Sequence, residues 1–328
     1  MEMLKYILRR LVLLIPVIIG VMLIVFFFQS ISGDDPALAI LGAGSTVEDR
    51  EAKREELGLN DPIAVQFGRY VWNFFTRGDL GDSYETGQPV TKEIFNRFPI
   101  TIQLALIAVF FGVILGVPLG IWSAIRQNKP IDNAIVTFSV FLESVPNFWL
   151  ALLLITAFSL RLHLLPSIFN RSFAGWVLPS ITVIVGSLSM IIRVTRSSML
   201  ETIRQDYVRT ARAKGQTEFK VILRHVLRNS LIPIVNSIGN SLGLLLGGAL
   251  IVETIFGMPG IGKYTIDAVS ARNYPSVLGS VVILAITFSL INLLVDLTYI
   301  IVNPSLKVSI IKKQQSRKQM RRMLKEGD

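Results

Sequence analysis

The sequence contains no cysteine, which excludes disulfide bonds, thiolate metal sites and cysteine nucleophiles. Histidine is nearly as scarce, because His163 and His225 are the only two and lie too far apart in the chain for a metal-binding motif. Only 17% of the residues are charged, whereas a soluble domain has about 25%. The sequence also shows no nucleophile–base pair or paired carboxylates at usable spacing, so we expect no enzyme active site.

Hydrophobic residues make up 51% of the chain and gather in long runs with little charge. A run of about 18 or more apolar residues is long enough to cross a bilayer as a helix. Six such runs predict an all-α polytopic membrane protein with six transmembrane helices. They cover residues 11–28, 100–122, 134–160, 172–192, 229–252 and 275–295.

The first run follows Lys5, Arg9 and Arg10, so both a signal peptide and a retained anchor fit it. Its apolar core of 18 residues exceeds the roughly 7–15 residues usual in signal peptides, which favours the anchor.

The positions of lysine and arginine predict how the six spans are oriented. If the N-terminus is cytoplasmic, the inside segments 1–10, 123–133, 193–228 and 303–328 hold 22 of the 33 basic residues. The short outside segments 161–171 and 257–276 hold 4. Since positive residues accumulate on the cytoplasmic side, both termini are predicted to be cytoplasmic. The net charge of +10 therefore follows the inner membrane surface, which argues against a nucleic-acid partner.

Residues 257–265, GMPGIGKYT, come close to the phosphate-binding loop G-x-x-x-x-G-K-[ST]. Tyr264 stands where that loop needs the hydroxyl that binds Mg²⁺. The stretch also follows a membrane helix rather than a strand, and the predicted orientation places it outside, where ATP is scarce. We therefore predict no nucleotide site and no cofactor bound by this chain.

Two long loops flank the spans. In the external loop 29–98, Ser45 with Glu48 predicts a capping box for a short helix that ends at Gly58. This loop is either a small cap on the helices or a docking surface. In the cytoplasmic loop 193–228, helical periodicity predicts two amphipathic helices separated by Gly215. That loop either lies on anionic lipid or docks into a cytoplasmic protein.

Several ordered stretches resemble one family. DYVRTARAKG (206–215), followed by LRHVLRNSLIP, is similar to the coupling loop of ATP-binding-cassette importer permeases, and most closely to the branch that serves peptides and nickel. Four further stretches resemble signatures of the same branch. They are GDLGDSYETGQPV (78–90), IVETIFGMPGIGKYTIDAVSARNYP (251–275), NLLVDLTYIIVNP (292–304) and the N-terminal YILRRLVLLIPVIIGV. The resemblance runs from about residue 5 to 306 and implies the first permease of a pair.

The resemblance implies a type I importer permease fold in a bacterial or archaeal cell (inner) membrane. The implied parts are an N-terminus with the first span (1–28), an external loop with short helices (29–98), a five-span core (99–306) and a basic cytoplasmic tail (307–328). The implied partners are membrane lipid, a second homologous permease, two ATPase subunits that bind ATP and Mg²⁺, and an external substrate-binding protein. The implied function is half of a pathway for di- or oligopeptides. Nickel or metal-chelate import is the alternative within the family. A secondary transporter is more remote, because it calls for inverted repeats and clustered charges that the sequence does not show.

The family resemblance assigns the contact with the ATPase to a set of residues in the cytoplasmic loop 193–228. These are Asp206, Arg209, Thr210, Ala211, Arg212, Gly215, His225, Leu227 and Arg228. The general motif E-A-A-x-x-x-G falls on Arg209, Thr210 and Ala211, so its glutamate is absent, and its later I-x-L-P falls on residues 225–228. We expect the apolar stripe of this loop to enter a cleft of the ATPase with a rim of arginines. In the closing motif, Asn303 replaces the usual aspartate.

Three acids lie within or beside the predicted spans: Glu143, Glu253 and Asp296. The last two are near span ends and are expected to be structural. Glu143 is deeper and beside Pro146, where a bent helix is expected to expose backbone groups, so these two are the candidate pathway residues. Glu143 is expected either to meet the ammonium group of a peptide or to pair with a neighbouring hydroxyl.

Two glycine ladders are candidates for helix packing: Gly112, Gly116 and Gly120, and Gly239, Gly243 and Gly247. Small residues four apart allow helix backbones to approach closely in lipid. Each ladder is expected either to pack within this chain or to face the second permease.

Overall fold

The computed structural model describes residues 2–32, 35–42 and 44–302 of the chain. These residues form helices and loops, with no β-strand among them. Asn303 and the predicted basic tail lie outside the described residues.

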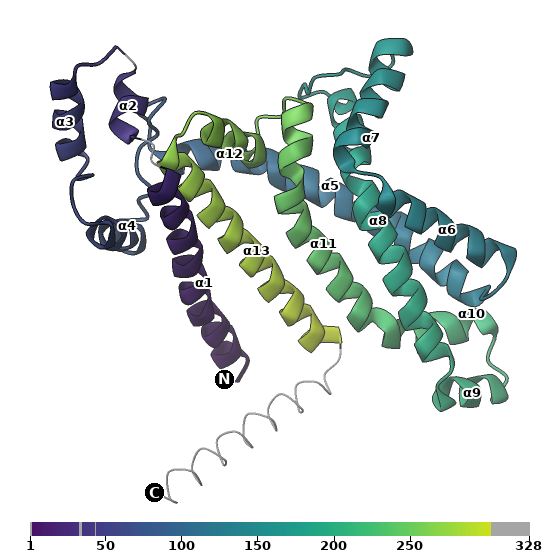
Figure 1. Ribbon diagram of the computed structural model, residues 1–328. Coiled ribbons are helices and arrows are strands. Elements are labelled where there is room, and N and C mark those ends of the chain that lie inside the picture. The colour runs from purple at the N-terminus through teal and green to yellow at the C-terminus, as the bar shows by residue number, and fades with distance from the viewer. Residues whose placement is uncertain (1, 33–34, 43, 303–328) are drawn as a thin grey trace, which may run out of the picture.

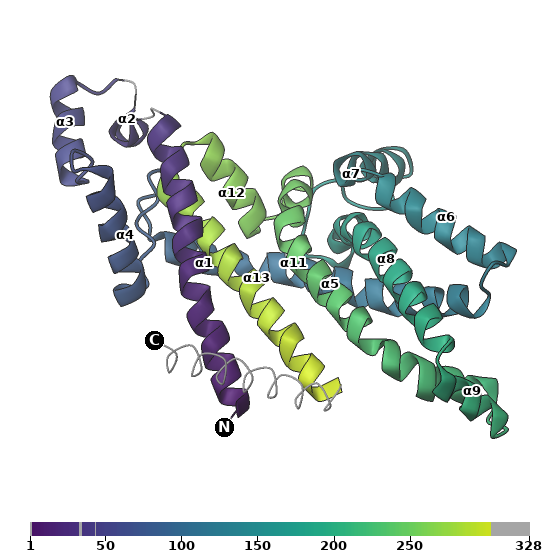
Figure 2. The ribbon, with the colours of Figure 1, turned by 60° about the horizontal axis from the view of Figure 1, so that its bottom comes forward.

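Within the described part, five helices are long and apolar enough to cross a membrane, and one bent pair makes a sixth candidate. The five are α1 (Glu2–Ser32), α5 (Val90–Ile125), α8 (Phe173–Ile203), α11 (Arg228–Ile255) and α13 (Tyr274–Val302). Each covers one of the predicted apolar runs, apart from Ser172, which is the N-cap of α8. Helices α1, α13, α11 and α8 lie side by side in this order, and α5 packs along α8 (Figures 1 and 2).

The bent pair corresponds to the predicted span 134–160. It consists of α6 (Pro130–Ser144) and α7 (Asn147–Leu154), which η1 (Ile155–Arg161) extends, and the two parts meet at 94°. Val145 is in an extended conformation just before Pro146, which is the conformation that a following proline favours. The predicted span is therefore broken at this proline.

The core of the helix bundle lies where α5, α8 and α11 meet. Leu104, Leu178 and Leu246 are almost completely buried there, one from each helix. By contrast, only 11% of the most apolar stretch of α1 is buried within this chain.

The loop predicted to be external forms three short helices, α2 (Pro36–Leu41), α3 (Val47–Glu56) and α4 (Ile63–Arg77). The predicted capping box is wrong by one residue. The cap of α3 is Thr46, whose hydroxyl accepts a hydrogen bond from the Asp49 N–H at 3.1 Å. Ser45 and Thr46 offer equivalent oxygens three residues before an acid, and only the backbone path decides between them.

Helix α12 (Ile261–Ser270) packs on the helix bundle against Leu80, Val90 and Ile94. Burial raises the pKa of Tyr264 to about 12. Its phenol therefore stays protonated and donates a hydrogen bond to the Ser276 hydroxyl at 2.8 Å.

The two ends of the bundle differ. The start of α1, the end of α13 and the short helix α9 (Asp206–Ala213) lie at one end, at the bottom of Figure 1. Helix α12 and the short helices α2 and α3 lie at the other end.

Candidate functional site

The predicted coupling loop is a compact helical turn at the end of α8. Helix α9 is followed by a turn at Gly215, then by α10 (Glu218–Lys220) and η2 (Val221–Leu227), which continues into α11 without a break. Asp206 lies in the first turn of α9 and Arg212 in the last, where their charges complement the helix dipole. The second predicted helix is therefore the beginning of the fifth span rather than a separate element.

Gly215 has a positive φ of 75°, a conformation that side chains with a β-carbon disfavour. Its N–H donates to the Arg212 carbonyl at 2.9 Å, which closes the turn after α9. Arg212 also forms two hydrogen bonds to the Glu218 carboxylate, at 2.7 and 3.1 Å, across the turn. The turn is thus held from both the backbone and the side chains.

The apolar stripe of α9 packs within this chain, contrary to the expectation that it enters a cleft of the ATPase. Val208 is fully buried and Ala211 is 5% exposed, against Val221, Val226 and Met199. The opposite face of α9 is solvent-exposed and contains Asp206, Tyr207, Arg209, Thr210 and Arg212. A docking partner would therefore meet these polar residues and the Tyr207 ring.

The other predicted coupling residues lie on η2 and the start of α11. His225 is half-buried and its Nε2 lies 2.9 Å from the Gln216 Oε1. Leu227 packs against the cluster that buries Val208. Arg228 is exposed at the first position of α11.

The near-match to a phosphate loop is a turn closed by the protein's own carboxylate. Glu253 is completely buried, and its Oε2 accepts a hydrogen bond from the Lys263 N–H at 3.0 Å. Its Oε1 accepts one from the Thr101 hydroxyl at 2.7 Å, and that hydroxyl accepts the Ile261 N–H at 2.9 Å. A helix N-terminus attracts anions, and here the chain's own carboxylate occupies it. A β-carbon at Gly262 would lie 2.7 Å from Oε2, so glycine is required there.

Glu143 pairs with an arginine rather than with a hydroxyl. Arg193 on α8 donates to Glu143, with N–O distances of 2.6 and 2.7 Å. Both side chains are about half exposed, at 48% for Glu143 and 42% for Arg193. Glu143 lies in the last turn of α6, directly before the break at Pro146.

A second ion pair on the same two helices was missed by sequence reasoning. Arg196 forms two hydrogen bonds to Asp132, at 2.7 and 2.8 Å, and the Asp132 side chain is only 1% exposed. The Ser123 hydroxyl and the Asn128 N–H also donate to this carboxylate. Asp132 lies in the first turn of α6, but in the sequence it falls in the short segment 123–133 between two predicted spans, where a charged residue is expected to be exposed to water.

The first glycine ladder faces α8. A β-carbon at Gly116 would lie 2.8 Å from the Ile191 side chain, and one at Gly120 would lie 2.8 Å from the Ile192 carbonyl. A β-carbon at Gly112 would touch the Ser187 hydroxyl at 3.1 Å.

The second ladder is divided between two environments. β-Carbons at Gly239 and Gly243 would overlap Val295 and Phe288 of α13. Gly247 has no such neighbour within 4 Å, so its face of α11 is open in this chain.

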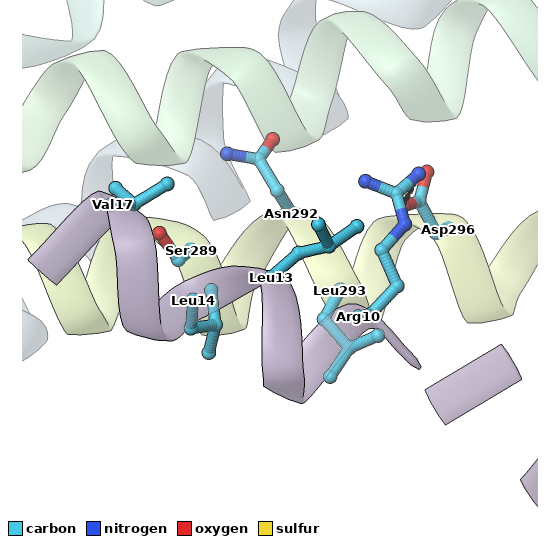
Figure 3. Close-up of a pocket in the computed structure, with 8 residues that line it drawn as sticks. All are labelled: Arg10, Leu13, Leu14, Val17, Ser289, Asn292, Leu293 and Asp296. Atoms are coloured by element: carbon cyan, nitrogen blue, oxygen red, sulfur yellow. Dashed lines mark ion pairs between the residues drawn. The ribbon is translucent and has the colours of Figure 1, made fainter. Parts of the chain in front are cut away.

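Arg10 near the start of α1 and Asp296 near the end of α13 join these two helices, and their charged atoms lie 2.6 Å apart. This ion pair borders a pocket of about 320 Å³ between the two helices. Its other lining residues are Leu13, Leu14, Val17, Ser289, Asn292 and Leu293 (Figure 3). Asp296 thus has a structural contact. Among the described residues no group of three or more His, Asp and Glu residues is arranged to hold a metal ion.

Two family models match the chain. Residues 116–308 match the family described as binding-protein-dependent transport system inner membrane component. Residues 3–105 match the corresponding N-terminal family.

Curated relatives cover nearly the whole chain. The glutathione transport system permease protein GsiC of Salmonella paratyphi A is 39% identical over 305 residues, which span 93% of this chain and 99% of the relative. The dipeptide transport system permease protein DppB of Escherichia coli K12 is 37% identical over 337 aligned residues, with the same shares covered.

Solved structures show a similar fold. A chain of the MetNI methionine ABC transporter, in an inward-facing conformation, aligns with a TM-score of 0.56 at 20% identity, covering 64% of this chain and 96% of that one. A chain of an amino acid ABC transporter solved with histidines aligns with a TM-score of 0.52 at 17% identity, covering 63% and 93%.

Proposed function

Because this chain belongs to the family of binding-protein-dependent transport system inner membrane components, we propose that it forms half of the pathway of an ATP-driven peptide importer. The observation that carries the peptide assignment is the identity of 37–39% with permeases named for glutathione and dipeptide transport, over 93% of the chain. Glutathione and dipeptides share a small peptide backbone with free ionised ends.

We further propose six spans with both termini in the cytoplasm. The bent pair α6–α7 supplies the sixth span, and an even number of spans returns the chain to the side where it began. The start of α1, the end of α13 and α9 share one end of the bundle (Figure 1), which is the end where most of the basic residues fall. In this arrangement residues 1–28 carry the N-terminus and first span, 29–98 form the external loop, 99–306 form the core and 307–328 are a cytoplasmic tail.

The energy for transport comes from partner subunits in this proposal. The one stretch of this chain that resembles a phosphate loop places Glu253, a carboxylate, where a phosphate would bind. We propose that two ATPase subunits bind ATP and Mg²⁺, that a second permease completes the pathway and that an external protein delivers the peptide.

The ATPase is proposed to contact the exposed face of α9. Tyr207, Arg209 and Thr210 lie on that face, while Val208 and Ala211 fasten the helix to the rest of the chain. Because η2 continues into α11, a displacement of α9 would be passed directly to a membrane span as the movement of a stiff element.

The test is purification of the chain from its own host's membrane in mild detergent, with identification of the proteins that accompany it. We expect a second permease and ATP-binding subunits. A chain that remains alone, or only with copies of itself, after crosslinking in intact membranes would contradict the proposal.

A further inference from the structure

The ion pair between Glu143 and Arg193 lies across two antiparallel helices. The contacts of Asp132 with Arg196 and of Ser139 with Ser189 show that α6 and α8 run in opposite directions. Helical side chains tilt toward the N-terminus of their own helix. Glu143 and Arg193 therefore reach toward each other from opposite directions and meet between the helices.

The α8 side of this pair is less apolar than a lipid-facing helix. Glu143 falls within the predicted span 134–160, and a charged side chain within a span faces a water-filled cavity or a protein neighbour, because lipid cannot solvate it. On α8, Gly186, Met190, Arg193 and Ser197 form one stripe at helical spacing, and each is exposed or half-exposed. Apart from Met190 this stripe carries none of the bulky apolar side chains that cover the exposed face of α1, among them Leu23, Ile24 and Phe28.

The attachment of α6 to α8 is supplied by other contacts. Asp132 and Arg196 are joined by two hydrogen bonds, and the Ser189 hydroxyl donates to the Ser139 carbonyl at 2.7 Å. The Asp132 carboxylate is enclosed by protein donors, whereas the Glu143 carboxylate remains about half exposed. The two pairs thus differ in the accessibility of their charges to a ligand.

The surroundings of each charge match one end of a peptide. Glu143 lies in the last turn of α6, where the helix dipole favours a cation, so an ammonium group is attracted by both the carboxylate and the helix end. Arg193 presents a planar guanidinium, which binds a carboxylate through two parallel hydrogen bonds.

We propose that Glu143 and Arg193 form a pathway site for zwitterionic cargo, in which Glu143 binds the ammonium end and Arg193 the carboxylate end of a small peptide. The ion pair opens to admit the peptide and closes after it leaves, so neither charge is unpaired between transport cycles. This site rests on the proposed function, because it requires peptide cargo.

The test compares free and blocked peptides in the assembled transporter, reconstituted in vesicles with its binding protein. The probes are dialanine, N-acetyl-dialanine and dialanine amide. The uptake rate of each variant is divided by the wild-type rate for the same probe, so that selection by the external binding protein cancels. We expect Glu143→Gln to lower dialanine and dialanine amide uptake about ten-fold, the change given by about 1.4 kcal/mol, and to leave the N-acetyl peptide unaffected. Arg193→Gln should lower the two probes with a free carboxylate and spare the amide.

The matched control is Asp132→Asn, which removes a charge from the buried pair on the same helices. It should lower the yield of assembled transporter and leave the ratios among the three probes unchanged. Equal losses for free and blocked peptides in Glu143→Gln would overturn the pathway site while leaving peptide import intact. A wild-type complex that moves none of the probes would instead contradict the proposed function itself, and the site with it.

A second measurement does not depend on cargo transport. Since the chain has no cysteine, a single cysteine can be placed at Gly186, on the stripe of Arg193 and inside the predicted span, and at Phe28, on the exposed face of α1. A water-soluble thiol reagent should modify Gly186→Cys in the assembled complex, with dialanine slowing the reaction, and should not modify Phe28→Cys. An unreactive Gly186→Cys would show that lipid or the second permease covers this face, and would overturn the site.

Discussion

The hydroxyl of Thr101 lies 2.7 Å from the carboxylate of Glu253, although the two residues are 152 positions apart in the chain. Both are fully buried. Thr101 donates to Glu253 and accepts the Ile261 N–H at 2.9 Å, so one hydroxyl connects α5, α11 and the start of α12. The turn that resembles a phosphate loop is thereby fixed to α5 and α11.

Replacing Thr101 with valine keeps the shape of the side chain but removes this connection. The Ile261 N–H and one carboxylate oxygen lose their partner, and we expect a loss of about 1–3 kcal/mol in unfolding free energy. The measurement is the midpoint of thermal unfolding in detergent. Thr182→Val is the matched control, because Thr182 is also fully buried but its hydroxyl bonds only the Leu178 carbonyl of its own helix. Equal shifts for the two variants would contradict the role given to Thr101.

Substitutions at Gly215 test whether the turn after α9 couples the ATPase to transport. Its φ of 75° strains any β-branched residue, while nothing lies within 4 Å of an added β-carbon. We expect Gly215→Val to cost about 1–2 kcal/mol in the turn and to lower ATP-driven uptake about ten-fold, with assembly and ATP hydrolysis retained. Gly215→Asn should retain most of the uptake, since asparagine tolerates the left-handed conformation. Unchanged uptake in the valine variant would show that this turn does not couple the subunits.

Gly120 and Gly247, one from each glycine ladder, predict opposite signs for the same substitution. At Gly120 a β-carbon would lie 2.6 Å from the Thr195 β-carbon and 2.8 Å from a backbone carbonyl, so Gly120→Ala should destabilise the chain by about 1–3 kcal/mol. At Gly247 the space is open, and Gly247→Ala should leave the chain unchanged or stabilise it by up to about 1 kcal/mol. Thermal unfolding of the isolated chain measures both, and destabilisation by the Gly247 variant would be the contrary result.

The spans could be predicted from the sequence because each depends on local composition. A run such as 172–192 has few ways to satisfy its backbone other than as a buried helix, and α8 contains all of it except Ser172, which caps the helix. The break in the third span was signalled by Pro146, although its angle of 94° depends on the helices around it. The cap of α3 was placed one residue too early, since two equivalent local signals were present.

The contacts between distant residues could not be predicted in this way. Asp132 and Arg196 are 64 positions apart, and no local pattern distinguishes a charge that pairs across helices from one that faces water. The same applies to Arg193, which was counted only as one of the basic residues of the inner side. The burial of Val208 and Ala211 was visible as an amphipathic stripe, but the stripe does not say whether this chain or a partner covers it.

The central claim is that this chain forms half of a peptide pathway powered by other subunits. Uptake of radiolabelled dialanine into vesicles tests it most directly, with the chain reconstituted together with its second permease, ATPases and binding protein. We expect uptake only when ATP is present on the side of the membrane where the ATPase subunits lie. Uptake should also stop when any one component is left out. Uptake by this chain alone, or uptake driven by an ion gradient without ATP, would contradict the account.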